Sequence, residues 1–119
     1  MTAKPVSYPT ESALQAACLD GLRKLGIWAI RMGVSVRSGK RGRAQSGEPG
    51  MFDLYLPGLG WQEVKQPDEK LSADQVKWQA KARRHGVSAE LVNSVDDCLM
   101  IAQLWRDKWQ EQQPSKSRN

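Results

Sequence analysis

The chain has 119 residues, a formal net charge of +5 and a sequence isoelectric point near 9.5, which favours a polyanionic partner. Hydrophobic residues make up 39% and charged residues 26%, values typical of one globular domain. No apolar run approaches the ~20 residues of a membrane span, and the first residues lack the apolar segment of a signal peptide. We therefore expect a soluble, intracellular protein with no membrane partner.

The first predicted element is a helix that follows a flexible leader, residues 1–9, which has two prolines and no periodicity. Thr10 is a favourable N-cap residue, and apolar residues then recur at helical spacing until Gly26 ends the pattern. These apolar residues are Leu14, Cys18, Leu22 and Leu25. Glu11 falls in the first turn, where a carboxylate interacts favourably with the helix dipole.

Residues 27–32 predict a strand, which residues 34–36 extend if Gly33 forms a bulge. The next segment, residues 37–50, carries four glycines and four basic residues. These basic residues are Arg37, Lys40, Arg41 and Arg43. We interpret the segment as a flap that contacts phosphates and closes over nucleic acid, because it leads directly into the next strand. The alternative is a solvated surface loop.

A β-hairpin is predicted from two runs with β character, residues 51–56 and 61–66, which flank the turn residues 57–60. Side chains alternate across a strand, so Asp53 shares a face with Tyr55, and Phe52 shares the other face with Leu54 and Leu56. This alternation predicts one apolar and one charged face.

The length of the loop decides whether the charged residues of the two strands meet. A loop with an odd number of residues, for instance 58–60 with Gly60 left-handed, places Asp53 on the same face as Glu63 and Lys65. An even loop separates them. In the odd register Asp53 and Glu63 are cross-strand neighbours, with Cβ atoms roughly 5 to 8 Å apart.

This trio of charged residues has a chemical and a structural interpretation. Two carboxylates that share a small face repel each other unless a cation lies between them, and Mg²⁺ prefers such oxygen ligands. A bound metal ion would activate a water and stabilise charge on a phosphoryl oxygen, while Lys65 would assist the attacking water. The structural alternative is a surface hairpin with a cross-strand salt bridge.

The remaining elements are a helix, a short strand and a last helix. Ser72 and Gln75 form an S-x-x-Q capping box that opens a helix to about His85, with Lys77 and Lys81 among its basic residues. Residues 88–92 predict a strand, and Ser94 caps a helix that reaches Trp109, where we expect contact with another subunit. Residues 110–119 are polar and expected to be disordered.

The predicted order, α-β-β-β-α-β-α, indicates an α/β fold with a mixed sheet flanked by helices, in one domain that covers residues 10–109. Cys18 and Cys98 fall in the first and last helices. We expect two buried thiols, because a disulfide or zinc site would need closer spacing or more ligands.

Asp53 followed by Glu63, Val64 and Lys65 resembles the D…(D/E)-x-K core of the PD-(D/E)xK nuclease superfamily. The surrounding sequence resembles the virus-type replication-repair nuclease domain (VRR-NUC) over roughly residues 11–104. The segments that carry this resemblance are Gly50 to Leu54, Glu63 to Lys65, Lys70 to Gln75, and Gly86. Phe52 departs from the family, which commonly has proline before the aspartate.

The resemblance implies a restriction-endonuclease-like core and a metal-dependent DNA endonuclease. Asp53, Glu63 and the Val64 carbonyl would hold one or two Mg²⁺ or Mn²⁺ ions, with Lys65 at the attacking water. Glu11 resembles the acidic residue that the family carries on its first helix, which reaches the metal directly or through water. Gln75 would face the site, although its capping role competes, since one side-chain conformation is expected to fill only one of the two roles.

The resemblance implies duplex or branched DNA as the partner, with four-way junctions as the preferred substrate. We also expect a homodimer that cuts two strands, because a domain this small offers a limited footprint on DNA. Arg37, Lys40, Arg41, Arg43, Lys77 and Lys81 would contact the DNA. A minimal nuclease of this kind would suit the cytoplasm of a bacterium or a phage-infected host cell. Two alternatives stay open: a non-catalytic basic DNA-binding protein on the same fold, and a sequence-specific restriction-type nuclease.

Overall fold

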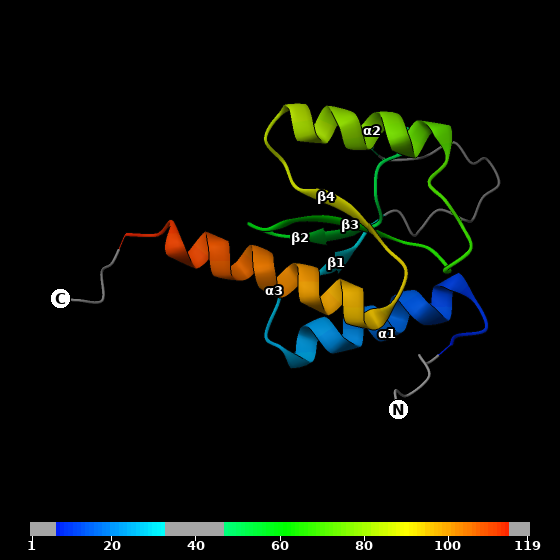
Figure 1. Cartoon of the computed structure of the whole chain (residues 1–119), viewed down its shortest axis with the longest axis horizontal. Coiled ribbons are helices and arrows are strands. Elements are labelled where there is room, and N and C mark those ends of the chain that lie inside the picture. The colour runs from blue at the N-terminus through cyan, green and yellow to red at the C-terminus, as the bar shows by residue number, and fades with distance from the viewer. Residues whose placement is uncertain (1–6, 33–46, 115–119) are drawn as a thin grey trace.

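A computed structural model describes residues 7–32 and 47–114 of the chain (Figure 1). It contains seven elements in the predicted order. They are α1 (Glu11–Lys24), β1 (Ile30–Arg31), β2 (Leu54–Leu56), β3 (Gly60–Val64), α2 (Ala73–Arg84), β4 (Ala89–Val92) and α3 (Val95–Glu111). The α/β class and the mixed sheet are therefore confirmed. Within the described ranges, no helix is long and apolar enough to cross a membrane.

The four strands lie in the order β1-β2-β3-β4, with antiparallel pairing up to β3 and parallel pairing of β3 with β4. The hairpin register pairs Leu54 with Gln62 and Leu56 with Gly60, so the loop has the odd number of residues that the sequence left open. The left-handed glycine of this loop is Gly58, at φ +80°, because Gly60 already begins β3. Continued by one pair, this register places Asp53 opposite Glu63.

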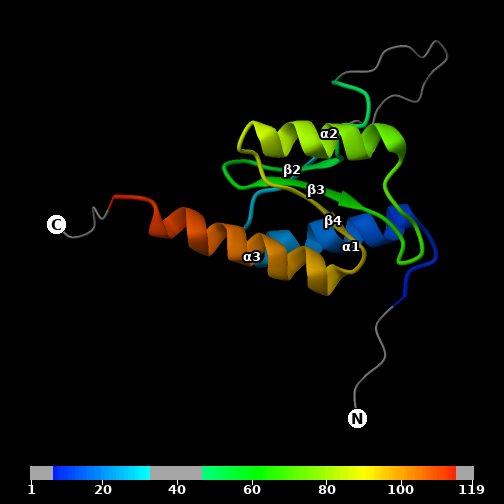
Figure 2. The same cartoon turned by 45° about the horizontal axis from the view of Figure 1, so that its top comes forward.

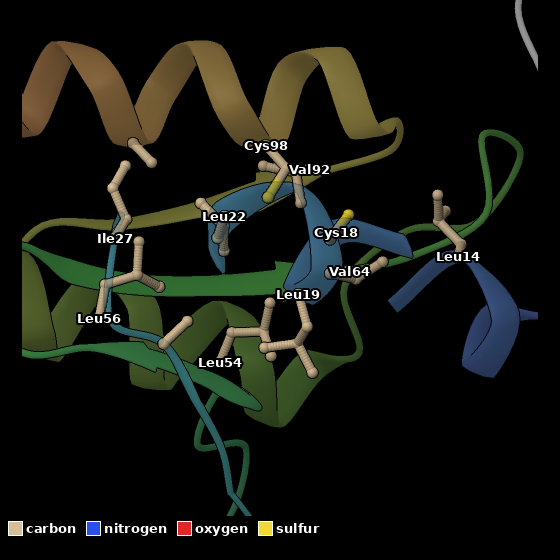
Figure 3. Close-up of a cluster of buried hydrophobic side chains, with 12 residues drawn as sticks. Leu14, Cys18, Leu19, Leu22, Ile27, Leu54, Leu56, Val64, Val92 and Cys98 are labelled. Carbon is tan, nitrogen blue, oxygen red and sulfur yellow. The ribbon is translucent and has the colours of Figure 1, made fainter. Parts of the chain in front are cut away.

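Helices cover both faces of the sheet, with α2 on one face and the α1 and α3 pair on the other (Figures 1 and 2). The larger core lies between the sheet and the α1 and α3 pair, where Leu54, Leu56 and Val64 are fully buried (Figure 3). Cys18 and Cys98 are free, fully buried thiols in this core, as predicted, and they interact with each other.

The opposite face differs from the charged face that strand alternation predicts. Phe52 is fully buried with Trp78 of α2, at a ring-centroid distance of 5.0 Å, and Trp61 contacts the same tryptophan at 5.3 Å. The prediction that Phe52 shares a face with Leu54 and Leu56 is wrong, since Phe52 precedes β2 and alternation does not govern it. Because apolar side chains fill the space under α2, the charged residues of the hairpin, Asp53, Glu63 and Lys65, lie toward one end of it.

Two predicted boundaries are also wrong. Tyr8, assigned to the flexible leader, packs against the larger core, and its carbonyl accepts a hydrogen bond from the Gln66 side chain at 3.0 Å. Helix α3 continues through Glu111, two residues into the segment expected to be disordered. Gly33 and residues 34–36, the expected bulge and strand extension, lie outside the described residues.

Candidate functional site

The hairpin brings Asp53 and Glu63 into direct contact at the end of β3. The Asp53 backbone N–H donates to Glu63 Oε1 at 3.0 Å. Asp53 is the residue before β2, and Glu63 is the next-to-last residue of β3. The odd register of the hairpin places these two residues opposite each other and so produces this contact. Lys65 follows β3 and is half-buried. The three residues predicted to share one site are therefore neighbours in the fold.

Glu63 is a carboxylate in an unfavourable environment, because its side chain is only 3% exposed. Burial and then the negative charge of Asp53 raise the pKa of Glu63 to about 7, against the opposing effects of the Asp53 N–H and Lys65. Asp53, Lys65 and Glu11 all act on this pKa, which places the four charged groups within electrostatic reach of one another. A cation at this position would remove the repulsion between Asp53 and Glu63.

Gln75 joins this site to the beginning of α2. Its Oε1 accepts from the Ser72 backbone N–H at 2.9 Å, and its own backbone N–H donates to Ser72 Oγ at 3.1 Å, which completes the capping box. Its Nε2 donates to Glu63 Oε2 at 3.0 Å. The expectation that one conformation could not fill both roles was wrong, because the two ends of an amide face opposite partners.

Glu11 lies in the first turn of α1, after the N-cap Thr10, as predicted. Burial raises the pKa of Glu11 and Lys65 opposes this effect, while Glu69 and Asp53 raise it further. However, the described residues contain no group of three or more His, Cys, Asp or Glu side chains placed to hold a metal ion. The structure thus brings Asp53 and Glu63 together as a pair and does not add Glu11 to it.

The oxygen atoms available at this end of the sheet suit a small, hard divalent cation. The backbone N–H groups of Trp61 and Lys65 both donate toward β4, and backbone groups alternate along a strand. The Val64 carbonyl therefore faces the opposite way, toward the segment that precedes β2. Two carboxylates and one carbonyl suit Mg²⁺ or Mn²⁺, which complete their coordination with water.

Gln15 is a residue of the site that sequence reasoning missed. It lies on α1, is 3% exposed, and its Nε2 donates to Asp53 Oδ2 at 3.4 Å. The signal was present, because Gln15 stands three and four residues before Cys18 and Leu19, on the buried stripe of the helix. A polar residue at an apolar position of a helix indicates a specific partner.

The predicted nucleic-acid contacts are only partly described. Lys77 and Lys81 are both exposed on α2, one helical turn apart. The Lys81 ammonium pairs with Glu48 at 3.1 Å, in an exposed ion pair that also links α2 to the segment before Gly50. Arg37, Lys40, Arg41 and Arg43 lie outside the described residues.

Comparisons of the chain with protein-family models, with curated proteins and with solved structures found no match. A function therefore has to be inferred from the residues of the site.

The raised pKa of Glu63 predicts how stability depends on pH. The folded protein holds the Glu63 proton more tightly than the unfolded chain, so stability is lost as pH rises from about 4.5 toward about 7. Without metal, we expect a loss of roughly 2 to 3 kcal/mol between pH 4.5 and pH 8. Thermal unfolding in EDTA measures this loss.

The control for this measurement is Glu63→Gln, which cannot ionise. Its unfolding midpoint should fall less steeply with pH than that of the wild type, whatever its absolute stability. Mg²⁺ added at pH 8 should raise the midpoint of the wild type alone, because the cation requires the ionised carboxylate. Parallel pH profiles of the two proteins would contradict the assignment of Glu63 as the buried, titrating carboxyl.

Proposed function

We propose that this protein is a metal-dependent endonuclease that hydrolyses DNA phosphodiester bonds. The observation that carries the proposal is the contact between a buried Glu63 and Asp53, with Lys65 as the adjacent cation. A buried carboxylate beside a second, half-buried one is destabilising for a purely structural protein, and sites with strongly perturbed pKa values are often functional.

Each residue of the site has a role in this chemistry. Asp53, Glu63 and the Val64 carbonyl would hold Mg²⁺ or Mn²⁺, which supplies a water of lowered pKa and charge stabilisation at the phosphate. Lys65 is half-buried beside the two carboxylates, so its ammonium can orient the attacking water or neutralise charge on the phosphate. Gln75 holds Glu63 in place, and Glu11 acts from the periphery through water.

The arrangement of strands supports a restriction-endonuclease-like core as part of the proposal. An antiparallel β1-β2-β3 meander, followed by a helix that crosses to a parallel β4, agrees with the fold that the resemblance to VRR-NUC implies. The net charge of +5 suits a DNA substrate. We propose four-way junctions as the preferred substrate, since a small domain acting as a dimer could cut two strands.

A homodimer would place its contact at the turn of the hairpin. Trp28 is 68% exposed and Trp109 is 44% exposed, and both line a cavity of about 200 Å³ beside Leu59 and Arg106. This end of the hairpin is opposite the carboxylate pair. We expect Trp28→Ala and Trp109→Ala to convert a dimer into a folded monomer, as measured by sedimentation equilibrium and circular dichroism. An unchanged dimer in both variants would contradict this surface as the interface.

A second candidate is a non-catalytic DNA-binding protein. It is favoured by the finding that, within residues 7–32 and 47–114, no third carboxylate joins Asp53 and Glu63 in a metal-holding group. Such a protein would bind DNA with an affinity that falls steeply with salt and does not depend on divalent metal.

The deciding experiment is cleavage of a linear duplex and an immobile four-way junction in Mg²⁺, Mn²⁺ or EDTA, with Glu63→Ala as control. We expect cleavage that requires metal and disappears in the variant, with preference for the junction. Cleavage of one short duplex sequence in preference to the junction would indicate a restriction-type nuclease. Binding without cleavage under every condition would favour the non-catalytic candidate.

A further inference from the structure

The geometry points to Gln15 as a positioning residue that orients Asp53 for metal binding. This inference rests on the proposed metal-dependent function, and it assigns a role to a residue outside the D…(D/E)-x-K motif. Gln15 reaches Asp53 from α1, across 38 positions of the sequence, with Nε2 donating to Oδ2 at 3.4 Å. The distance is at the long end for a hydrogen bond, so its effect should be moderate.

The burial of Gln15 indicates that this contact is a specific one. Its neighbours on the buried stripe of α1 are Leu14, Cys18 and Leu19, all part of the larger core. An amide at such a position costs free energy unless it finds a partner, and an apolar side chain would pack there without that cost. A gain in stability therefore does not account for a glutamine at this buried position, whereas its hydrogen bond to Asp53 does.

The chemistry of an amide suits this role. A lysine or arginine at the same place would neutralise Asp53 and compete with a cation. The uncharged Gln15 N–H fixes the rotation of the carboxylate and leaves its negative charge in place. Ligands of a metal are commonly oriented by such outer hydrogen bonds, and losing one typically lowers metal affinity or activity about 10 to 100-fold.

Gln15 and Gln75 together form an amide pair that holds both carboxylates from opposite sides of the sheet. Gln15 of α1 donates to Asp53, and Gln75 of α2 donates to Glu63. Because α1 and α2 cover opposite faces (Figure 1), the two carboxylates are fixed by two independent helices. The distance between the two carboxylates therefore depends on how α1 and α2 pack on the sheet.

The test is Gln15→Leu, which keeps an apolar volume in the core and removes the donor, together with Gln15→Asn, which shortens the amide. The matched control is Gln79→Leu, since the Gln79 amide donates to the Ala89 carbonyl, outside the carboxylate pair. Two quantities are measured for each protein: Mn²⁺ affinity without DNA, by equilibrium dialysis, and the Mn²⁺ concentration that gives half-maximal cleavage. Thermal unfolding in EDTA establishes that each variant is folded.

We expect both Gln15 variants to weaken Mn²⁺ affinity by about ten-fold, with cleavage restored at saturating Mn²⁺, and Gln79→Leu to behave as the wild type. If Gln15 had a purely structural role, the Gln15 variants would lose stability and keep wild-type Mn²⁺ affinity. Wild-type Mn²⁺ affinity in the Gln15 variants, or an equal loss in Gln79→Leu, would overturn the inference, as would a wild-type protein that binds no Mn²⁺. If Mn²⁺ affinity depends on Gln15 but no DNA is cut, the positioning role stands and the proposed nuclease function fails.

Discussion

Asp53→Asn is expected to lower the rate of DNA cleavage by roughly three orders of magnitude, the scale found when one charge-stabilising group of an active site is removed. The substitution keeps the shape of the side chain and removes the charge that, with Glu63, would hold the metal. DNA binding should remain close to that of the wild type, because the substitution removes no positive charge. Cleavage and binding of the same labelled junction, assayed in Mg²⁺, measure the two effects separately.

Asp53→Asn should lose activity but keep or gain stability. The Asp53 charge contributes to the raised pKa of Glu63, so its removal relieves repulsion at a buried carboxylate. We therefore expect the unfolding midpoint of Asp53→Asn in EDTA to equal or exceed that of the wild type at pH 8. Loss of activity without loss of stability would show that the substitution removes a catalytic group and leaves the fold intact.

Lys65→Ala separates the lysine from the carboxylates in the same assay. It should lose cleavage to a similar degree while its Mn²⁺ affinity stays the same or rises, because a competing cation is gone. The matched controls are Asp68→Asn and Lys70→Ala, two exposed residues on the segment that follows the site. If Asp53→Asn or Lys65→Ala protein cuts DNA at the wild-type rate, the site assignment is wrong.

Gly50→Ala is expected to destabilise the protein by roughly 3 to 5 kcal/mol, since it adds left-handed strain to steric overlap. Gly50 has φ +81°, and a Cβ at this position would overlap the Asp74 carbonyl and lie 2.8 Å from the Gln75 backbone nitrogen. Both neighbours are backbone atoms in the first turn of α2, so no side chain can rotate away. Urea denaturation measures the loss.

Gly26→Ala is the matched control. Gly26 has a similar φ of +76° but nothing within 4 Å of the added Cβ, so it should lose only the roughly 1 to 2 kcal/mol of left-handed strain. Any displacement of α2 in Gly50→Ala would also move Gln75 from Glu63, so we expect a further loss of activity in the folded fraction. Equal destabilisation by the two substitutions would show that close approach to α2 is not important.

Local patterns of the sequence predicted much of this fold. Helical periodicity and capping residues located α1, α2 and α3, and the S-x-x-Q pattern predicted the capping box at Ser72. The pair of Asp53 and Glu63 was predictable because hairpin register has only two outcomes, odd or even. Each of these features depends on residues that are close together in the sequence.

The features that were missed depend on residues far apart in the sequence. Gln15 meets Asp53 across 38 positions, and Gly50 meets the first turn of α2. Phe52 lies under Trp78 because α2 supplies an aromatic surface there, which strand alternation cannot reveal. In each case the tertiary packing of a helix decided what a local pattern left open.

The hydrogen bonds of Gln75 couple the first turn of α2 to the position of the Glu63 carboxylate. In most helices, fraying of the first turn affects only the helix. Here fraying would break the bond from Gln75 to Glu63 together with the capping box, so an ion held by Glu63 would favour the closed turn. By reciprocity, whatever holds that turn closed would raise affinity for the proposed ion by the same factor, so fraying of one helix end would lower the occupancy of the proposed metal site.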